Sequence, residues 1–177
     1  LRNFGDMTTA DYLIIGKRAR NAGRKVGLLI LDLYTRWIMV YPLIGRTAKE
    51  AKEAFIDFAG PVQRIRGLYS DNAPELIKVC KDLHFARSKS IPYRSSSNTE
   101  AEYGIQRVLR FTRAALTRAG LGEEWWPQAI TYVCWLFNTE VINGDSPYNR
   151  RHRKGHFAHN RPPFGCQVYF MPRDTHK

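Results

Sequence analysis

Three carboxylates on three different predicted elements are the residues of this chain best suited to chemistry. Asp11 ends a Thr-rich strand-like run, and Asp71 follows a short apolar run and precedes a helix that Pro74 opens. Glu102 lies near the start of a long amphipathic helix. Such a set makes a poor ion-pair network, whereas divalent cations prefer oxygen ligands. The sequence therefore predicts a metal site at the edge of an α/β sheet, where ligands commonly bind.

The chemistry predicted for such a site is phosphoryl transfer. Three crowded carboxylates repel one another, and burial would protonate one of them unless cations are present. Two divalent ions about 3.5–4 Å apart activate an attacking oxygen and stabilise the leaving oxygen of an in-line displacement.

Two pairs of acidic residues compete for these roles. Asp11 is preferred to Asp6 because an apolar-flanked strand leads into it. At about 100° per residue, Glu102 lies at the edge of the buried helix stripe, and Glu100 lies nearly opposite, facing solvent beside Arg107. The stripe consists of Ala101, Ile105, Val108, Leu109, Thr112, Leu116 and Ala119.

The elements that position the carboxylates alternate between strands and helices. The predicted strands are 4–15, 26–31, 37–41, 65–68 and 84–88, and the predicted helices are 48–59, 74–83, 99–119 and 124–138. The first three strands suit an antiparallel meander. Thr47 and Glu50 form a capping-box pattern before the first helix. The Ser-rich segment 89–98 is predicted to be a mobile lid beside Glu102.

Charge is the strongest compositional signal. The chain has 28 Lys and Arg against 16 Asp and Glu, a net charge of +12. Basic residues gather in 16–25 and again in 148–177. This surplus favours a polyanionic partner, nucleic acid first, although a solvated basic tail is the alternative for the second cluster.

Several residues have a structural interpretation that we prefer to a functional one. Asp32 suits a turn between strands, and the pair Trp125 and Trp126 suits packing at a helix entry more than base stacking. His152, His156 and His159 have ligand-like spacing, but without cysteines nearby they are expected to belong to the basic tail.

Length and composition predict one domain with an extension. The 177 residues, 44% of them hydrophobic, suit a catalytic core at 1–143 and a basic, Pro/Gly-containing extension at 144–177 with a strand candidate at 167–170. No run of 18 apolar residues exists, so no membrane partner is expected. Cys80, Cys134 and Cys166 are predicted to be free thiols. The start at Leu1 suggests a piece of a longer polyprotein.

The order of these motifs resembles the catalytic core of retroviral and retrotransposon integrases, the D…D…E transferases of the ribonuclease H-like superfamily. The segments that carry the resemblance are 4–11, 32–42, 69–72, 91–102, 125–138, 146–148 and 164–169. The resemblance implies an α/β ribonuclease H-like fold, with a mixed five-stranded sheet (an antiparallel meander plus parallel strands) flanked by helices. It also implies two Mg²⁺ or Mn²⁺ ions bound by Asp11, Asp71 and Glu102.

The activity implied by the resemblance is trimming of an element's DNA ends and joining of them to target DNA. The residues expected to contact DNA flank the carboxylates, share their helix edge or belong to the basic extension: Asn72, Lys89, Tyr93, Arg94, Asn98, Gln106, Arg113, Arg150, Arg151, Arg153 and Lys154. A homo-oligomer, other polyprotein domains as partners, and a nuclear location are also expected.

Two other functions stay open. The chain departs from the family pattern at Ala73 and Tyr103, so a catalytically dead, domesticated DNA-binding remnant is one alternative. A ribonuclease H-type nuclease that cuts an RNA–DNA hybrid is the other, because it would use the same carboxylate cage.

Overall fold

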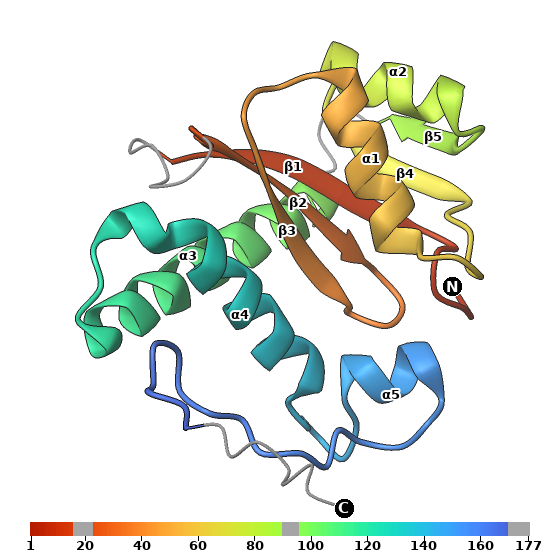
Figure 1. Cartoon of the computed structure of the whole chain (residues 1–177). Coiled ribbons are helices and arrows are strands. Elements are labelled where there is room, and N and C mark those ends of the chain that lie inside the picture. Colours follow the sequence, from red (N-terminus) through yellow and green to blue (C-terminus); the bar gives the residue numbers. More distant parts are fainter. Residues whose placement is uncertain (16–22, 90–95, 170–177) are drawn as a thin grey trace, which may run out of the picture.

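The computed structural model describes residues 1–15, 23–89 and 96–169, and the side chains of 88–89 and 96–98 are not part of that description. A mixed five-stranded sheet lies at the centre of the molecule (Figure 1). Its strands are β1 (Thr8–Ile14), β2 (Val26–Asp32), β3 (Ile38–Leu43), β4 (Gly67–Ser70) and β5 (Ala86–Lys89), in the spatial order β3-β2-β1-β4-β5. β1, β2 and β3 pair antiparallel, and β4 joins β1 and β5 in parallel. The predicted meander and mixed sheet are confirmed.

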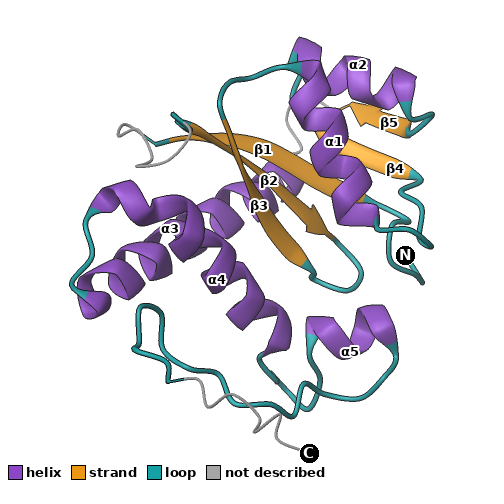
Figure 2. Ribbon diagram, viewed as in Figure 1, coloured by secondary structure: helices purple, strands orange, loops and turns teal. Residues whose placement is uncertain are grey.

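Helices cover both faces of the sheet (Figure 2). They are α1 (Ala48–Ala59), α2 (Pro74–Asp82), α3 (Ser96–Ala119) and α4 (Trp126–Thr139), with the 3₁₀ turn η1 (Glu123–Trp125) before α4 and the short α5 (Pro147–His152) after it. α1 and α2 pack in one apolar core, and α3 and α4 pack in the other. None of the described helices combines the length and hydrophobicity needed to cross a membrane.

β2 explains why two cores are possible. Leu28 and Ile30 enter the core with α1, whereas Leu29 and Leu31 enter the core with α3 and α4. All four are almost completely buried, and each such side chain contributes roughly 1.5–3 kcal/mol. A continuous apolar run is what a strand covered on both sides requires.

α4 is fixed to the edge of the sheet by a buried amide. The Asn138 side chain accepts the Ile38 N–H at 2.9 Å and donates to the Ile38 carbonyl at 2.8 Å. Trp126 is buried in the same core, which confirms the packing interpretation for it. Cys134 is also buried there, and burial raises the pKa of its thiol to about 12. Cys80 is buried and Cys166 exposed, and all three thiols are free as predicted.

The turns follow the local sequence closely. Thr47 caps α1 by accepting the Glu50 N–H, while the Glu50 carboxylate accepts the Ile44 N–H and the Thr47 hydroxyl. Asp32 is the predicted turn former, because it accepts the N–H and hydroxyl of Thr35. Asp32 also accepts the N–H of Gly5 at 2.8 Å, which ties the N-terminal segment to the sheet.

Several predicted boundaries are wrong. β1 begins at Thr8 and not at residue 4, and it runs on past Asp11 to Ile14, so Asp11 lies within the strand and does not end it. α3 begins at Ser96, because Ser and Asn suit helix starts as well as loops. Of the predicted lid, 90–95 lies outside the described residues. No strand forms at 167–169, and the extension contains α5, which Ser146 caps by accepting the Asn149 N–H.

Arg151 of α5 holds the extension on the core. Its guanidinium donates to the Phe58 carbonyl at 2.8 Å and to the Ala59 carbonyl at 3.2 Å, at the end of α1. It also lies 4.1 Å from the ring centre of Phe4 and 4.6 Å from that of Trp37. Burial lowers the pKa of Arg151 to about 10. Helix ends leave carbonyls without partners, and Arg151 satisfies two of them, so this side chain is directed inward. The boundary between a catalytic core at 1–143 and an extension at 144–177 stays a prediction.

We expect Arg151→Met to lower the free energy of unfolding by about 3 kcal/mol, because a charge-assisted hydrogen-bond set and the ring contacts disappear together. Arg150→Met removes only an exposed ion pair with Asp145 and is expected to cost about 0.5 kcal/mol. Urea denaturation of both variants measures the difference. Equal losses would show that Arg151 does not fasten α5 to the core.

Candidate active site

The parallel pairing of β1 and β4 brings two of the predicted carboxylates to the same level. Thr8 pairs with Leu68 and Thr9 with Tyr69. The same register continued past Ser70 sets Asp11 level with Asp71. Asp71 follows the carboxyl end of β4, in the turn before α2. The sheet thus places these two residues side by side from elements far apart in the chain.

The surroundings of Asp11 disfavour its charged form. It is half-buried, and its Oδ1 accepts the Tyr12 N–H at 2.7 Å. Burial raises the pKa of Asp11, and the negative charges of Asp71 and Glu102 raise it further, while the Tyr12 N–H and the Arg46 charge act in the opposite direction. The three predicted residues therefore lie within electrostatic range of one another. A bound cation would relieve this repulsion, so the donor set fits a divalent metal.

The carboxylates are near one another without forming a closed cage. Within the described part of the chain, no three Asp, Glu, His or Cys side chains are arranged to hold a metal ion as they stand. Asp71 and Glu102 are exposed, and Asp71 Oδ1 accepts the Ala73 N–H at 3.1 Å. This bond makes Asp71 the first residue of an Asx-turn. The N-cap residue of α2 is Ala73, which forms no side-chain hydrogen bond.

Asp6 has a different environment from Asp11. Its carboxylate accepts the N–H groups of Arg2 and Asn3 at 2.9 and 3.0 Å and pairs with Arg66 at 3.4 Å. The two backbone hydrogen bonds, with the Arg66 charge, hold the pKa of Asp6 below its usual value. Asp6 precedes β1 and stabilises a local turn. These contacts support Asp11 as the ligand, which stays a prediction.

The two glutamates also differ. The charge of Glu102 acts on Asp11, whereas Glu100 forms an ion pair with Arg36 from the β2–β3 turn. Arg107, further along α3, pairs with Glu140 and lies over the Phe137 ring, 4.0 Å from its centre.

Arg87 is a residue of this site that the sequence analysis missed. From β5 its guanidinium donates to the Asn72 side chain at 2.6 Å and to the Asp71 carbonyl at 3.2 Å. It is the cation that holds the Asp71 turn against the sheet. A single Arg in a four-residue strand gives no pattern by which to find it, because its position depends on the β4–β5 pairing.

The residues predicted to contact DNA fall into three groups. Gln106 and Arg113 are exposed on α3, and Asn72 is exposed beside Arg87. Arg153 and Lys154 are exposed just after α5, Arg150 pairs with Asp145, and Arg151 is directed toward the carbonyls at the end of α1. The third group lies beyond the description: the side chains of Lys89 and Asn98 are not described, and Tyr93 and Arg94 lie outside the described residues.

Comparison with solved structures identifies the architecture. No family model and no curated protein matches the sequence. The HTLV-2 integrase catalytic core, in a trimeric form with magnesium, matches 85% of this chain and 98% of its own at a TM-score of 0.66 and 15% identity. The BIV integrase catalytic core matches 82% of this chain and 92% of its own, with a TM-score of 0.62 and 16% identity. The chain has the integrase catalytic-core fold.

A larger assembly contains the same fold. A chain of the simian T-cell lymphotropic virus intasome, in complex with the PP2A regulatory subunit B56 gamma, matches 99% of this chain and 62% of its own. The TM-score is 0.67 and the identity 15%. The predicted ribonuclease H-like fold class is confirmed by these matches. At such low identity, the likeness establishes the fold and leaves the roles of individual residues as predictions.

We expect Asp11→Asn to weaken Mn²⁺ binding at least about tenfold and Asp6→Asn to leave it unchanged, as measured by calorimetry on the metal-free protein. When folding raises the pKa of a carboxyl group, the folded protein becomes less stable as the pH rises from the unfolded pKa to the folded pKa of that group. Asp11→Asn should therefore raise the metal-free thermal midpoint at pH 7, and Asp6→Asn should lower it. Unchanged Mn²⁺ affinity in Asp11→Asn would exclude Asp11 as a ligand.

Proposed function

We propose that this chain is an integrase-like polynucleotidyl transferase that trims the DNA ends of a mobile element and joins them to target DNA. The observation that carries the proposal is the half-buried Asp11, whose pKa is raised by burial and by the charges of Asp71 and Glu102 on an integrase-core fold. Such a destabilised anion suits a site completed by cations.

Asp11, Asp71 and Glu102 are the residues that would hold two Mg²⁺ or Mn²⁺ ions. When bound, these ions supply Lewis-acid activation of the attacking oxygen and stabilisation of the leaving oxygen. Backbone N–H groups orient the aspartates, since Tyr12 binds Asp11 Oδ1 and Ala73 binds Asp71 Oδ1. The second oxygen of each aspartate is the one available to a cation. Such outer hydrogen bonds fix the direction of a ligand.

The exposed positions of Asp71 and Glu102 have a mechanistic consequence. Both side chains are open to solvent, so substrate and cations can reach them, and small adjustments around the oriented Asp71 would close the cage on binding. DNA phosphates would supply further oxygen ligands. The attacking group is first water, during trimming, and then the 3′-hydroxyl of the element end, during joining.

The charge of the chain supports DNA as substrate. With a net charge of +12, affinity should depend strongly on salt and weakly on base sequence. We also propose a homo-oligomer, further domains of a polyprotein as partners, and a nuclear location, where the target DNA lies.

We expect Asp71→Asn to reduce metal-dependent DNA cleavage and joining by at least about a thousandfold while the fold is kept, because the missing ligand contributes several kcal/mol at the transition state. Labelled DNA ends with Mg²⁺ provide the assay, and circular dichroism provides the folding control. Near-parental turnover would reject the catalytic assignment. An inactive parent chain would favour the domesticated remnant, and cleavage of RNA–DNA hybrids alone would favour the nuclease.

The two glutamates provide a matched pair in the same assay. Glu102→Gln should be inactive, because it removes one of the three negatively charged ligands proposed to hold the metal ions. Glu100→Gln should retain activity within about threefold, because Glu100 contacts Arg36 and not the aspartates. The reverse ranking would show that the wrong face of α3 has been assigned.

A further inference from the structure

A cleft of about 1190 Å³ opens at the end of the parallel strands opposite the carboxylates. Its walls come from the end of α1, the segments that enter β4 and β5, and α5. Because Asp71 follows the carboxyl end of β4, the cleft is separate from the candidate active site, and none of the three carboxylates lines it. The volume exceeds the roughly 300–1,000 Å³ of pockets that enclose small molecules, so an extended ligand is favoured.

The charge of the cleft is positive. Its basic residues are Arg64, Arg66, His84, Arg150, Arg151, His152 and Arg153, and none of the described residues that line it is Asp or Glu. Some of this charge is offset, because Arg66 pairs with Asp6 and Arg150 with Asp145. Arg64 and Arg153 form no ion pair within the described part of the chain and are available to an anionic ligand.

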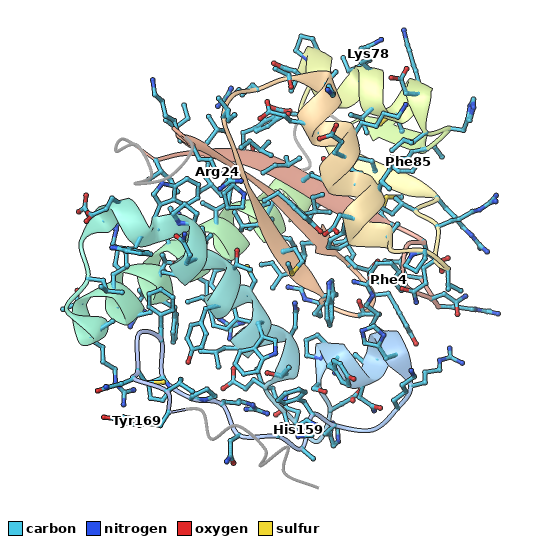
Figure 3. All side chains as sticks on the ribbon, in the orientation of Figure 1. Phe4, Arg24, Lys78, Phe85, His159 and Tyr169 are labelled. Atoms are coloured by element: carbon cyan, nitrogen blue, oxygen red, sulfur yellow. The ribbon has the colours of Figure 1, made fainter. Side chains whose placement is uncertain are left out.

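Apart from Asn3 and Gln63, the remaining surface of the cleft is largely apolar. Val62 is 89% exposed, Ile56 52% and Tyr34 38%, while Phe4 and Phe85 are partly buried. Figure 3 shows Phe4 and Phe85 on the same side of the molecule. Exposed aliphatic and aromatic groups contribute little to binding a duplex through its phosphates alone. Together with free guanidinium groups they match sites for single strands, where phosphates meet cations and bases stack on side chains.

We propose that this cleft binds a single-stranded nucleic-acid segment, with phosphates on Arg64 and Arg153 and bases against Tyr34 and the apolar wall. This goes beyond the transferase activity, since it requires neither metal ions nor the carboxylates. The cleft holds a strand in place, and no bond is made or broken there.

Fluorescence anisotropy with a labelled thymidine oligonucleotide in EDTA tests the charge. Arg64→Glu should weaken binding at least about tenfold and reduce the slope of log affinity against log salt by about 0.7 for each phosphate that is no longer neutralised. Arg118→Glu makes the same charge change at the far end of α3 and should weaken binding less than about twofold. Val62→Asp and Ile44→Asp form a second matched pair at the two ends of α1, with the large loss expected only for Val62→Asp. Equal effects within both pairs would overturn the proposal.

Base stacking is tested separately. Tyr34→Ala should weaken oligonucleotide binding about fivefold and leave duplex binding unchanged, because only unpaired bases reach a stacking side chain. Equal loss for both ligands, or no loss, would overturn single-strand binding in favour of a phosphate-only surface. Displacement of the oligonucleotide by poly-glutamate at equal charge concentration would overturn it in favour of an acidic peptide. Asp71→Asn should bind the oligonucleotide as tightly as the parent chain does. A failure of the transferase proposal can therefore be told apart from a failure of the single-strand proposal.

Discussion

The parallel pairing of β1 with β4 is the constraint on which the rest of this structure depends. It joins the antiparallel meander to the two short strands and sets Asp11 level with Asp71. Parallel strands require a crossover, and here α1 makes that crossover and shares a core with α2. A slip by one residue would turn Asp11 toward α1 and α2 and Ala10 toward α3. The register of a few residue pairs therefore decides whether the carboxylates can meet.

Electrostatics divides the two ends of the parallel strands. At the carboxyl ends, the carboxylates of Asp71 and Glu102 lie near the half-buried Asp11, and their repulsion remains until a cation or a proton neutralises it. At the amino ends, the cleft beside α5 is lined by basic residues. The carboxylate site is thus complementary to cations, and the basic cleft is complementary to a polyanion. The distribution of charge, and not only its sum, is what supports the nucleic-acid partner that we propose.

What could be predicted from the sequence is what depends on local periodicity. The buried positions Ala101, Val108 and Leu116 of α3 follow from the helical repeat, and the apolar run of β2 indicates a strand covered on both faces. The hydrogen bonds that Asp32 accepts from Thr35 follow from turn chemistry. The preference for Glu102 over Glu100 rests on the same periodicity, and the electrostatic environment of Asp11 agrees with it.

Contacts between distant residues could not be predicted in the same way. Arg36 pairs with Glu100, and Arg87 reaches Asn72, because the folded sheet brings these groups together. The charge of Arg151 suggested a DNA contact, yet its guanidinium is directed toward the carbonyls of α1. A sequence shows that a side chain is basic but gives no sign of which way it faces.

The amide of Asn138 has a consequence for assembly. β3 is an edge strand, and edge strands are where sheets of different molecules add to one another. By binding both the N–H and the carbonyl of Ile38, Asn138 occupies the backbone groups that an incoming strand would need. At Ile38, therefore, β3 offers an incoming strand neither a free donor nor a free acceptor, and copies of this chain that approach this part of the edge would meet through side chains.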